Sequence, residues 1–169
     1  MGFVPQLSQL VATSSVMTNV IHGFAGNTRT LRCCFQSLAP QWMREKAMQQ
    51  IEEVGLAGKE MQQASSLSGG EAQRCAIARS LVGNPSVVIA DEPTASLDAN
   101  TRKDIQRLLR TIADSRNCTV LVTTHLLDEA TEYYHRAIGL RDGKLVLDQQ
   151  VASLSEEDVA SIFREVNDH

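Results

Sequence analysis

Two adjacent carboxylates, Asp91 and Glu92, are the residues of this chain best placed to do chemistry. They follow a short apolar run, Val87–Ala90, which predicts a strand buried on both faces of a parallel sheet. Open α/β sheets bind their ligands at the C-terminal ends of their strands. A carboxylate there can position Mg²⁺, often through water, and we expect this of Asp91. Glu92 is placed to polarise an attacking water as a general base.

A second candidate group is Ser68-Gly69-Gly70, which comes directly before a predicted helix, Glu71–Leu81. Glycines let backbone approach a ligand closely, and the free N–H groups at a helix start can hold an anion. Taken alone, the same pattern fits an ordinary turn and helix N-cap. An apolar run that ends in an acid is also common, so the order of the motifs along the chain carries more information than any one of them.

The ordered set of motifs resembles the ATP-binding subunit of ABC transporters. In that family LSGGE, at residues 67–71, is the signature motif, and VVIADEP, at residues 87–93, is the Walker B motif. SLD at residues 96–98 matches the D-loop, and a predicted strand, Thr119–Thr123, leads to His125 as the switch histidine. Chance agreement of all four motifs in this order is negligible.

The resemblance implies ATP and Mg²⁺ as cofactors and a role for each matching residue. Gln6 matches the Q-loop glutamine, whose amide carbonyl would ligate Mg²⁺ together with Asp91. Glu92 and His125 would be the catalytic residues, the first by activating water and the second by bonding the γ-phosphate. The signature and D-loop residues would meet a nucleotide held by the opposite subunit. The implied cofactor-binding residues are Ser68, Gly69, Gly70, Glu71 and Asp98, together with Gln6.

The phosphate-binding pattern G-x-x-x-x-G-K-[ST] occurs nowhere in the sequence. In the resembled family it precedes the Q-loop glutamine, so this chain corresponds to the C-terminal part of such an ATPase. The expected fold is α/β: a P-loop NTPase core of the ABC ATPase type with a parallel sheet, missing the P-loop strand and the N-terminal β subdomain, with an inserted helical subdomain. A fragment, a reading frame opened at an internal methionine and a broken gene are all compatible with this.

Unpaired sheet edges should make the chain marginal in stability and prone to aggregate.

We expect the whole chain, residues 1–169, to form one partial ABC ATP-binding domain. Its helical subdomain should span about residues 17–83, and the remaining core residues 1–16 and 84–150. A capped, amphipathic C-terminal helix is expected within residues 151–169. Pro5 stands where relatives usually carry an apolar residue, and it removes one backbone donor directly before the Q-loop glutamine.

Three further segments have clear local patterns. Residues 41–54 and 101–113 carry apolar residues at helical spacing and predict helices. Residues 137–147 predict a β-hairpin that turns at Asp142-Gly143. In the expected helical subdomain, Phe24, Phe35 and Trp42 either fill a small core or form a docking face for a membrane subunit.

The bulk composition narrows the class of function. A net charge of −4, a pI near 5.5 and an aromatic content of 4% give no basis for binding nucleic acid. The adjacent cysteines Cys33 and Cys34 have no metal-ligand spacing and predict reduced thiols in a cytosolic protein. The sequence has neither a signal peptide nor an apolar run approaching the roughly 18 residues of a membrane span. Membrane association would then come through a partner.

The function we expect is that of an ATP-binding and ATP-hydrolysing subunit of an ABC importer, present as a part that does not hydrolyse ATP alone. Residues 18–24 together with 29–38, and residues 138–146, look most like the phosphonate-importer type. The implied partners are a second ATP-binding subunit and integral membrane permease subunits, which place the chain on the cytoplasmic face of the plasma membrane.

Two alternatives to this function remain. The chain could be a non-catalytic remnant or binding module that presents its signature face to an intact partner. It could also be an ATPase half of the SMC or DNA-repair type. Against the latter stand the acidic pI and the compact insert of about 60 residues between Gln6 and Leu67, where those proteins have long coiled coils.

Overall fold

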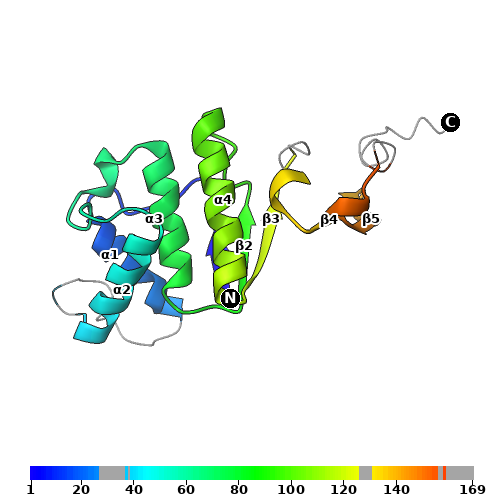
Figure 1. Cartoon of the computed structure of the whole chain (residues 1–169). Coiled ribbons are helices and arrows are strands. Elements are labelled where there is room, and N and C mark those ends of the chain that lie inside the picture. The colour runs from blue at the N-terminus through cyan, green and yellow to red at the C-terminus, as the bar shows by residue number, and fades with distance from the viewer. Residues whose placement is uncertain (27–36, 38, 126–130, 156–157, 159–169) are drawn as a thin grey trace. The chain divides into compact units, whose positions relative to one another are not determined.

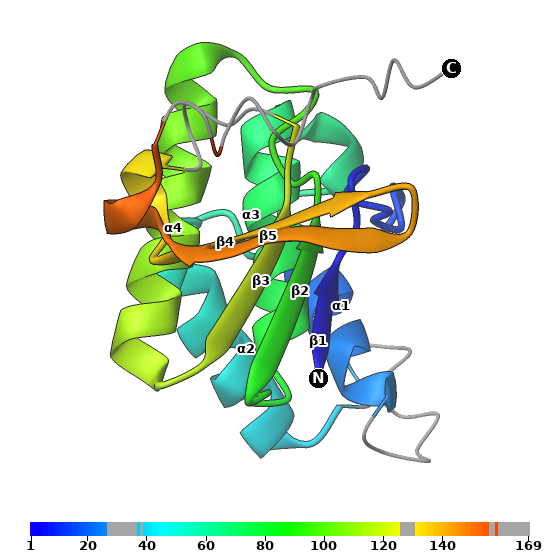
Figure 2. The same cartoon turned by 90° about the vertical axis from the view of Figure 1, so that its right-hand side faces the viewer.

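The computed structural model of the chain describes residues 1–26, 37, 39–125, 131–155 and 158. The chain forms two compact units, Met1–Thr123 and Thr124–His169, and each is described here by itself. Figure 1 labels α1–α4 and β2–β5, and Figure 2 also labels β1.

A three-stranded parallel sheet forms one layer of the first unit (Figure 2). Its strands are β1 (Gly2–Val4), β2 (Val87–Asp91) and β3 (Thr119–Thr123), and β2 lies in the middle. The apolar and β-branched runs in the sequence predicted strands at these places. Parallel neighbours need long crossover connections, and the helices of the unit lie within those connections.

The four α-helices among the described residues of the first unit lie together behind the sheet in Figure 2. They are α1 (Val16–Ile21), α2 (Gln41–Glu53), α3 (Gly69–Leu81) and α4 (Ala99–Arg116). Short 3-10 segments occur at His22–Gly26 and Ala64–Ser66. No helix in the described part of the chain is both long and apolar enough to cross a bilayer.

Helix α3 is the centre of the core. It packs against α1, α2, α4 and β1, and four consecutive residues, Cys75–Ala78, are completely buried. The alanines in this run let the neighbouring elements approach closely. Burial raises the pKa of the Cys75 thiol to about 12, so the group stays protonated and unreactive. Cys75 and Cys118 are free thiols, whereas Cys33 and Cys34 lie outside the described residues.

The prediction that β2 is buried on both faces was wrong. Val88 and Ala90 are buried at 1% and 0% exposure, but Val87 and Ile89 on the other face are only half-buried. Phe3, which the sequence places at the end of a buried strand, is 53% exposed. The reason is that the described helices of the first unit pack on the face that carries Val88 and Ala90.

The predicted helices agree with the structure, with small shifts at their ends. Helix α3 begins at Gly69, two residues before the predicted Glu71, because Ser68 takes the N-cap position. Phe24 fills the small helical core, and Trp42 meets it edge to face at 5.2 Å between ring centroids while remaining half exposed. Phe35 lies outside the described residues.

The second unit contains the predicted hairpin. Strands β4 (Arg136–Arg141) and β5 (Lys144–Gln150) pair antiparallel around Asp142 and Gly143, whose φ angles are +50° and +73°. Two residues in the left-handed region are what a tight hairpin turn requires. Most of the predicted C-terminal helix, residues 156–157 and 159–169, lies outside the described residues. Its predicted start is marked by Ser155, whose N–H and hydroxyl both donate to Asp158.

One buried polar side chain, Asn19 on α1, fixes the loop that follows Gln6. Its Nδ2 donates to the carbonyl oxygens of Val11 (3.1 Å), Ser15 (3.0 Å) and Ser14 (3.4 Å). Its Oδ1 accepts from the Val11 N–H at 2.8 Å. The side chain is fully buried, so each of these bonds replaces water that cannot enter.

We expect Asn19→Ala to lower the free energy of unfolding by about 2–3 kcal/mol, because it leaves buried backbone groups without partners. Urea denaturation followed by the fluorescence of Trp42, the single tryptophan, measures this. Asn100→Ala, at an exposed position of α4, is the matched control and should change stability by less than about 0.5 kcal/mol. Equal effects of the two substitutions would contradict the assigned role of Asn19.

Candidate functional site

The C-terminal ends of β2 and β3 meet through one threonine. The Thr123 hydroxyl donates to Asp91 Oδ1 at 2.7 Å and accepts from the Glu92 N–H at 2.9 Å. The parallel register pairs Asp91 with Thr123, which brings the two side chains to the same edge of the sheet. Thr123 thereby orients Asp91, whose side chain remains exposed and able to bind a ligand. The sequence predicted the strand but not this role of Thr123.

Glu92 has an unusual backbone conformation, with φ at +40°. Non-glycine residues rarely adopt the left-handed region, and such strain persists where the surrounding structure holds it in place. Here the Thr123 hydroxyl holds the Glu92 N–H, and the Glu92 carbonyl accepts from the Ala95 N–H at 3.2 Å. The chain therefore turns sharply after Asp91. As a result the two adjacent carboxylates have different partners: Asp91 accepts from Thr123 and Glu92 accepts from Gln6.

Gln6 joins this group from the end of β1. Its Nε2 donates to Glu92 Oε2 at 3.0 Å, although the two residues are 86 positions apart in the sequence. The structure thus brings together three of the predicted site residues, Gln6, Asp91 and Glu92, at one end of the parallel sheet.

The segment around Gln6 is held from α3. Arg79 donates to the carbonyl oxygens of Ser8 and Gln9, each at 2.8 Å. Gln73 is buried and donates to the Pro5 carbonyl at 3.4 Å. Pro5 has no N–H, but its carbonyl is used, so the departure from the family pattern at this position is accommodated. The sequence showed Gln73 only as a residue of the helix and did not single out Arg79.

The signature motif forms a complete capping box at the start of α3. Ser68 Oγ accepts from the Glu71 N–H at 3.3 Å, and Glu71 Oε2 accepts from the Ser68 N–H at 2.8 Å and from its hydroxyl at 2.9 Å. Lys59 forms an ion pair with the other oxygen of the Glu71 carboxylate. The hydrogen bond from Lys59, with those from Ser68, lowers the pKa of Glu71 to about 2.

The glycines of the signature motif lie against the D-loop and the first turn of α4. A Cβ added to Gly70 would stand 2.5 Å from Thr101 Cγ2, and one added to Gly69 would stand 3.3 Å from Leu97 Cδ2. The absence of side chains therefore lets the first turns of α3 and α4 approach, besides leaving room for a ligand. Asp98 is the N-cap of α4, and the hydrogen bond from the Thr101 hydroxyl at 2.5 Å lowers the pKa of its carboxyl.

His125 follows β3 by two residues and is exposed. It belongs to the second unit, whereas Gln6, Asp91 and Glu92 belong to the first. Its predicted role toward a γ-phosphate therefore stays a prediction.

The donor atoms at the strand ends suit Mg²⁺. Asp91 and Glu92 supply carboxylate oxygens, and Gln6 supplies an amide oxygen. Mg²⁺ favours oxygen ligands and is commonly held by one or two carboxylates, with water and phosphate oxygens completing its shell. Among the described residues no cluster of three or more His, Cys, Asp or Glu side chains is arranged to hold a metal by itself. A site built from these residues fits a metal that arrives with a phosphate ligand.

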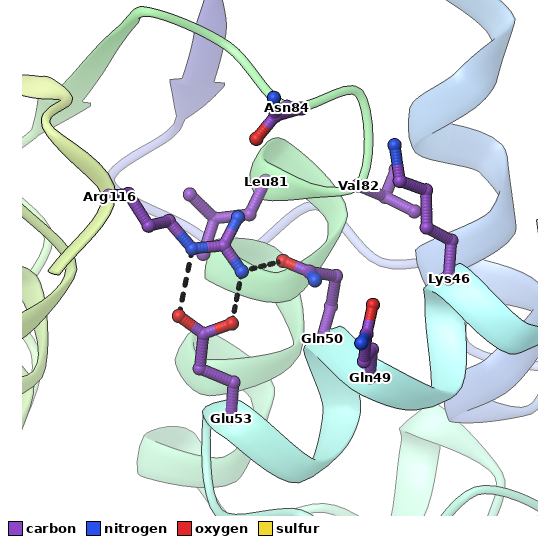
Figure 3. A pocket seen from close by; sticks show the side chains of 8 residues that line it. All are labelled: Lys46, Gln49, Gln50, Glu53, Leu81, Val82, Asn84 and Arg116. Carbon is purple, nitrogen blue, oxygen red and sulfur yellow. Dashed lines mark hydrogen bonds and ion pairs between the residues drawn. The ribbon is translucent and has the colours of Figure 1, made fainter.

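A separate pocket of about 280 Å³ lies at the other end of the strands (Figure 3). Two of its lining residues, Asn84 and Arg116, come before β2 and β3, whereas the candidate site follows them. Arg116 donates to Glu53 and to Gln50 Oε1, the latter at 2.5 Å, so its charge is used to fasten α4 to α2. We therefore interpret this pocket as part of the helix packing and not of the candidate site.

The profile of the ABC transporter family matches residues 1–95, which is more than half of the chain. The phosphonates import ATP-binding protein PhnC of Frankia casuarinae is 41% identical over 164 residues, covering 96% of this chain and 64% of that relative. PhnC of Shouchella clausii is 43% identical over 158 residues, covering 94% and 59%. A phosphate-import ATP-binding protein PhnC of Mycolicibacterium smegmatis is 37% identical, covering 98% and 62%.

Solved structures give the same result for the fold. A metal-chelate type ABC transporter in an inward-facing conformation matches with a TM-score of 0.84 at 26% identity, covering 96% of this chain and 62% of that one. The ATP-binding cassette MJ0796, dimeric and bound to ADP and Pi, matches with a TM-score of 0.71 at 30% identity, covering 89% and 62%. This chain spans between 59% and 64% of the length of the three PhnC relatives described above. By its family profile, its fold and the order of its motifs, the chain belongs to the ABC transporter family as an ATP-binding domain.

Proposed function

We propose that this chain is the larger part of an ATP-binding and ATP-hydrolysing subunit of an importer for phosphonate or a similar oxyanion. The observation that carries the proposal is the contact of Gln6 with Glu92 beside Asp91, at the end of a parallel sheet where α/β proteins bind their ligands. Two relatives that carry the name of phosphonate import and one that carries the name of phosphate import support the substrate class.

Each residue of the site has a distinct role in this proposal. Asp91, oriented by Thr123, and Gln6 would hold Mg²⁺, which neutralises phosphate charge when bound. Glu92 would accept the proton of the attacking water as general base. In the structure its carboxylate accepts a hydrogen bond from Gln6, and this contact orients the base from the neighbouring strand. His125 would bond the γ-phosphate after β3.

The signature residues would serve a nucleotide on another subunit. Ser68, which is exposed, and Gly70, which is partly buried, stand at the start of α3, where backbone N–H groups favour an anion. The dimeric state of MJ0796 supports a pair of ATP-binding subunits as the working form. The partners would then be a second such subunit and membrane permease subunits, with the chain on the cytoplasmic face of the membrane.

The sequence lacks the glycine-rich loop that cradles the β- and γ-phosphates in P-loop ATPases. Phosphoryl transfer depends mainly on positioning and on neutralising charge, so loss of the cradle removes most of the catalytic power. A second candidate function follows: the chain acts without catalysis by presenting its signature face to an intact partner. The observation that supports this candidate is the capping box that orders the signature motif at the exposed Ser68.

We expect the purified chain to hydrolyse ATP no faster than its Glu92→Gln variant, and to associate with an intact Shouchella clausii PhnC when ATP and Mg²⁺ are present. Analytical ultracentrifugation of the mixture measures association, and phosphate release measures turnover. Ser68→Arg should weaken the association about tenfold or more, since it places a bulky charge at the signature face. Ser65→Arg, at an exposed position nearby, is the matched control.

Turnover of the chain alone above that of Glu92→Gln would contradict the expected inactivity. Absence of an ATP-dependent complex would contradict the proposed role of the signature face. Equal binding by Ser68→Arg and Ser65→Arg would do so as well.

The Glu71 carboxylate makes the stability of the folded chain depend on pH. Its pKa in the folded chain is about 2, below the ordinary value of 4.5, so the unfolded state binds its proton first as the pH falls. The stabilisation by Glu71 is therefore complete above pH 4.5 and is lost as the pH falls from 4.5 toward 2. The hydrogen bond from Lys59 is the largest cause of the lowered pKa of Glu71. Lys59 should therefore control how strongly the stability depends on pH.

We expect Glu71→Gln to destabilise the chain at neutral pH, and its deficit relative to the natural chain to shrink below pH 4.5. Lys59→Met should reduce the same acid dependence while keeping the carboxylate. Urea denaturation at a series of pH values measures both. Lys103→Met, at an exposed position of α4, is the control, and an acid profile altered equally by both lysine substitutions would rule out the specific role of Lys59.

A further inference from the structure

In the proposed function the signature motif meets a phosphate group, yet the motif itself carries a negative charge. Glu71 is its last residue, and Glu71 Oε2 lies 2.9 Å from Ser68 Oγ. A phosphate oxygen bound to the same hydroxyl would stand at most about 6 Å from this carboxylate oxygen. Two anions at that distance repel each other, so the charge of Glu71 opposes the ligand that the N–H groups of the helix start attract.

The Ser68 hydroxyl has a single proton, and in the structure this proton is directed to Glu71. Ser68 Oγ accepts from the Glu71 N–H at 3.3 Å and donates to Glu71 Oε2 at 2.9 Å. A hydroxyl can donate only one hydrogen bond at a time. A phosphate group therefore competes with the carboxylate for this proton, and the outcome depends on how strongly the carboxylate attracts it.

Lys59 supplies the opposite charge from another part of the chain. Its ammonium forms an ion pair with Glu71 Oε1, the carboxylate oxygen that does not bond Ser68. The backbone of Lys59 is fixed in a turn: its N–H donates to the Leu56 carbonyl and its carbonyl accepts from the Gln62 N–H, each at 3.0 Å. The side chains of Lys59 and Glu71 are only 39% and 26% exposed, so solvent ions screen the pair less than an open surface pair.

The ion pair changes the carboxylate in two ways that favour a phosphate ligand. It cancels the charge that a phosphate group would otherwise meet beside Ser68. It also stabilises the ionised form of Glu71, because the hydrogen bond from Lys59 is the largest cause of the lowered pKa. A carboxylate stabilised in this way attracts the Ser68 proton less strongly, so the hydroxyl can turn to a phosphate oxygen at lower cost.

We propose that Lys59 is a positioning residue of the signature motif: it neutralises Glu71 so that Ser68 can donate its hydroxyl proton to a phosphate group of a nucleotide held by another subunit. Lys59 acts through Glu71, from a position twelve residues earlier in the sequence and outside the motifs that match the family. This role of Lys59 rests on the proposed function, because it takes the signature motif as a phosphate contact.

A double-mutant cycle tests this role with the fluorescently labelled 169-residue chain and intact Shouchella clausii PhnC, in excess ATP and Mg²⁺ at neutral pH. Lys59→Met removes the charge and should raise the dissociation constant of the complex about tenfold. In the Glu71→Gln background, which has no charge to neutralise, Lys59→Met should raise it less than about twofold. Lys59→Arg keeps the charge and should bind like the natural chain. Fluorescence-detected sedimentation measures the dissociation constants.

The controls separate binding from folding. Lys46→Met removes the same charge at an exposed position of α2 and should leave the dissociation constant within about twofold of the natural value. Binding of all variants is compared well below the lowest thermal midpoint, which is measured separately. Natural affinity of Lys59→Met, or an equal penalty in both backgrounds, would overturn the role of Lys59 and leave the proposed function standing. Absence of any ATP-dependent complex with the natural chain would overturn the proposed role of the signature face, and the role of Lys59 with it.

Discussion

Parallel pairing of β2 with both of its neighbours is the constraint on which the site depends. Gln6, Asp91 and Thr123 are distant in the sequence, yet each stands at or just after the C-terminal end of a strand in the same sheet. The register therefore gathers an amide, a carboxylate and a hydroxyl at one edge without any direct sequence relation between them. The left-handed turn at Glu92 then directs a second carboxylate toward Gln6. A slip of one residue in β2 would send its side chains to the opposite faces and separate this group.

Helix α3 connects the residues at the strand ends with the rest of the first unit. Its first residues form the signature cap, and farther along it Gln73 and Arg79 hold the backbone around Gln6. Arg74 donates to the Val54 carbonyl at 2.8 Å and so also fixes the segment that follows α2. The signature start and the loop at Gln6 are therefore attached to one helix, whose central residues Cys75–Ala78 are completely buried. A displacement at either place is transmitted through packing rather than through a flexible linker.

Local patterns in the sequence were sufficient to predict the elements, because their causes are local. Apolar β-branched runs predicted β2 and β3, Ser68 marked the start of α3, and Asp142-Gly143 predicted the hairpin turn. The residues that the sequence did not reveal act over long separations. Arg79 reaches Ser8 and Gln9 across about 70 positions, and Thr123 reaches Asp91 across 32. The residue type of an arginine or a threonine does not predict which distant group it will contact. Only the tertiary fold determines that partner.

The incorrect prediction for β2 is informative in itself. Its continuous apolar run, Val87–Ala90, has the composition of a strand covered on both faces, but the described helices of the first unit pack on one. Burial of apolar surface is worth roughly 25 cal/mol per Å², so an uncovered row of large side chains forgoes a stabilisation that its composition would permit. Phe3 and Leu121 continue the same mismatch on the neighbouring strands. The apolar composition of the sheet therefore predicts more burial than the described helices of the first unit provide.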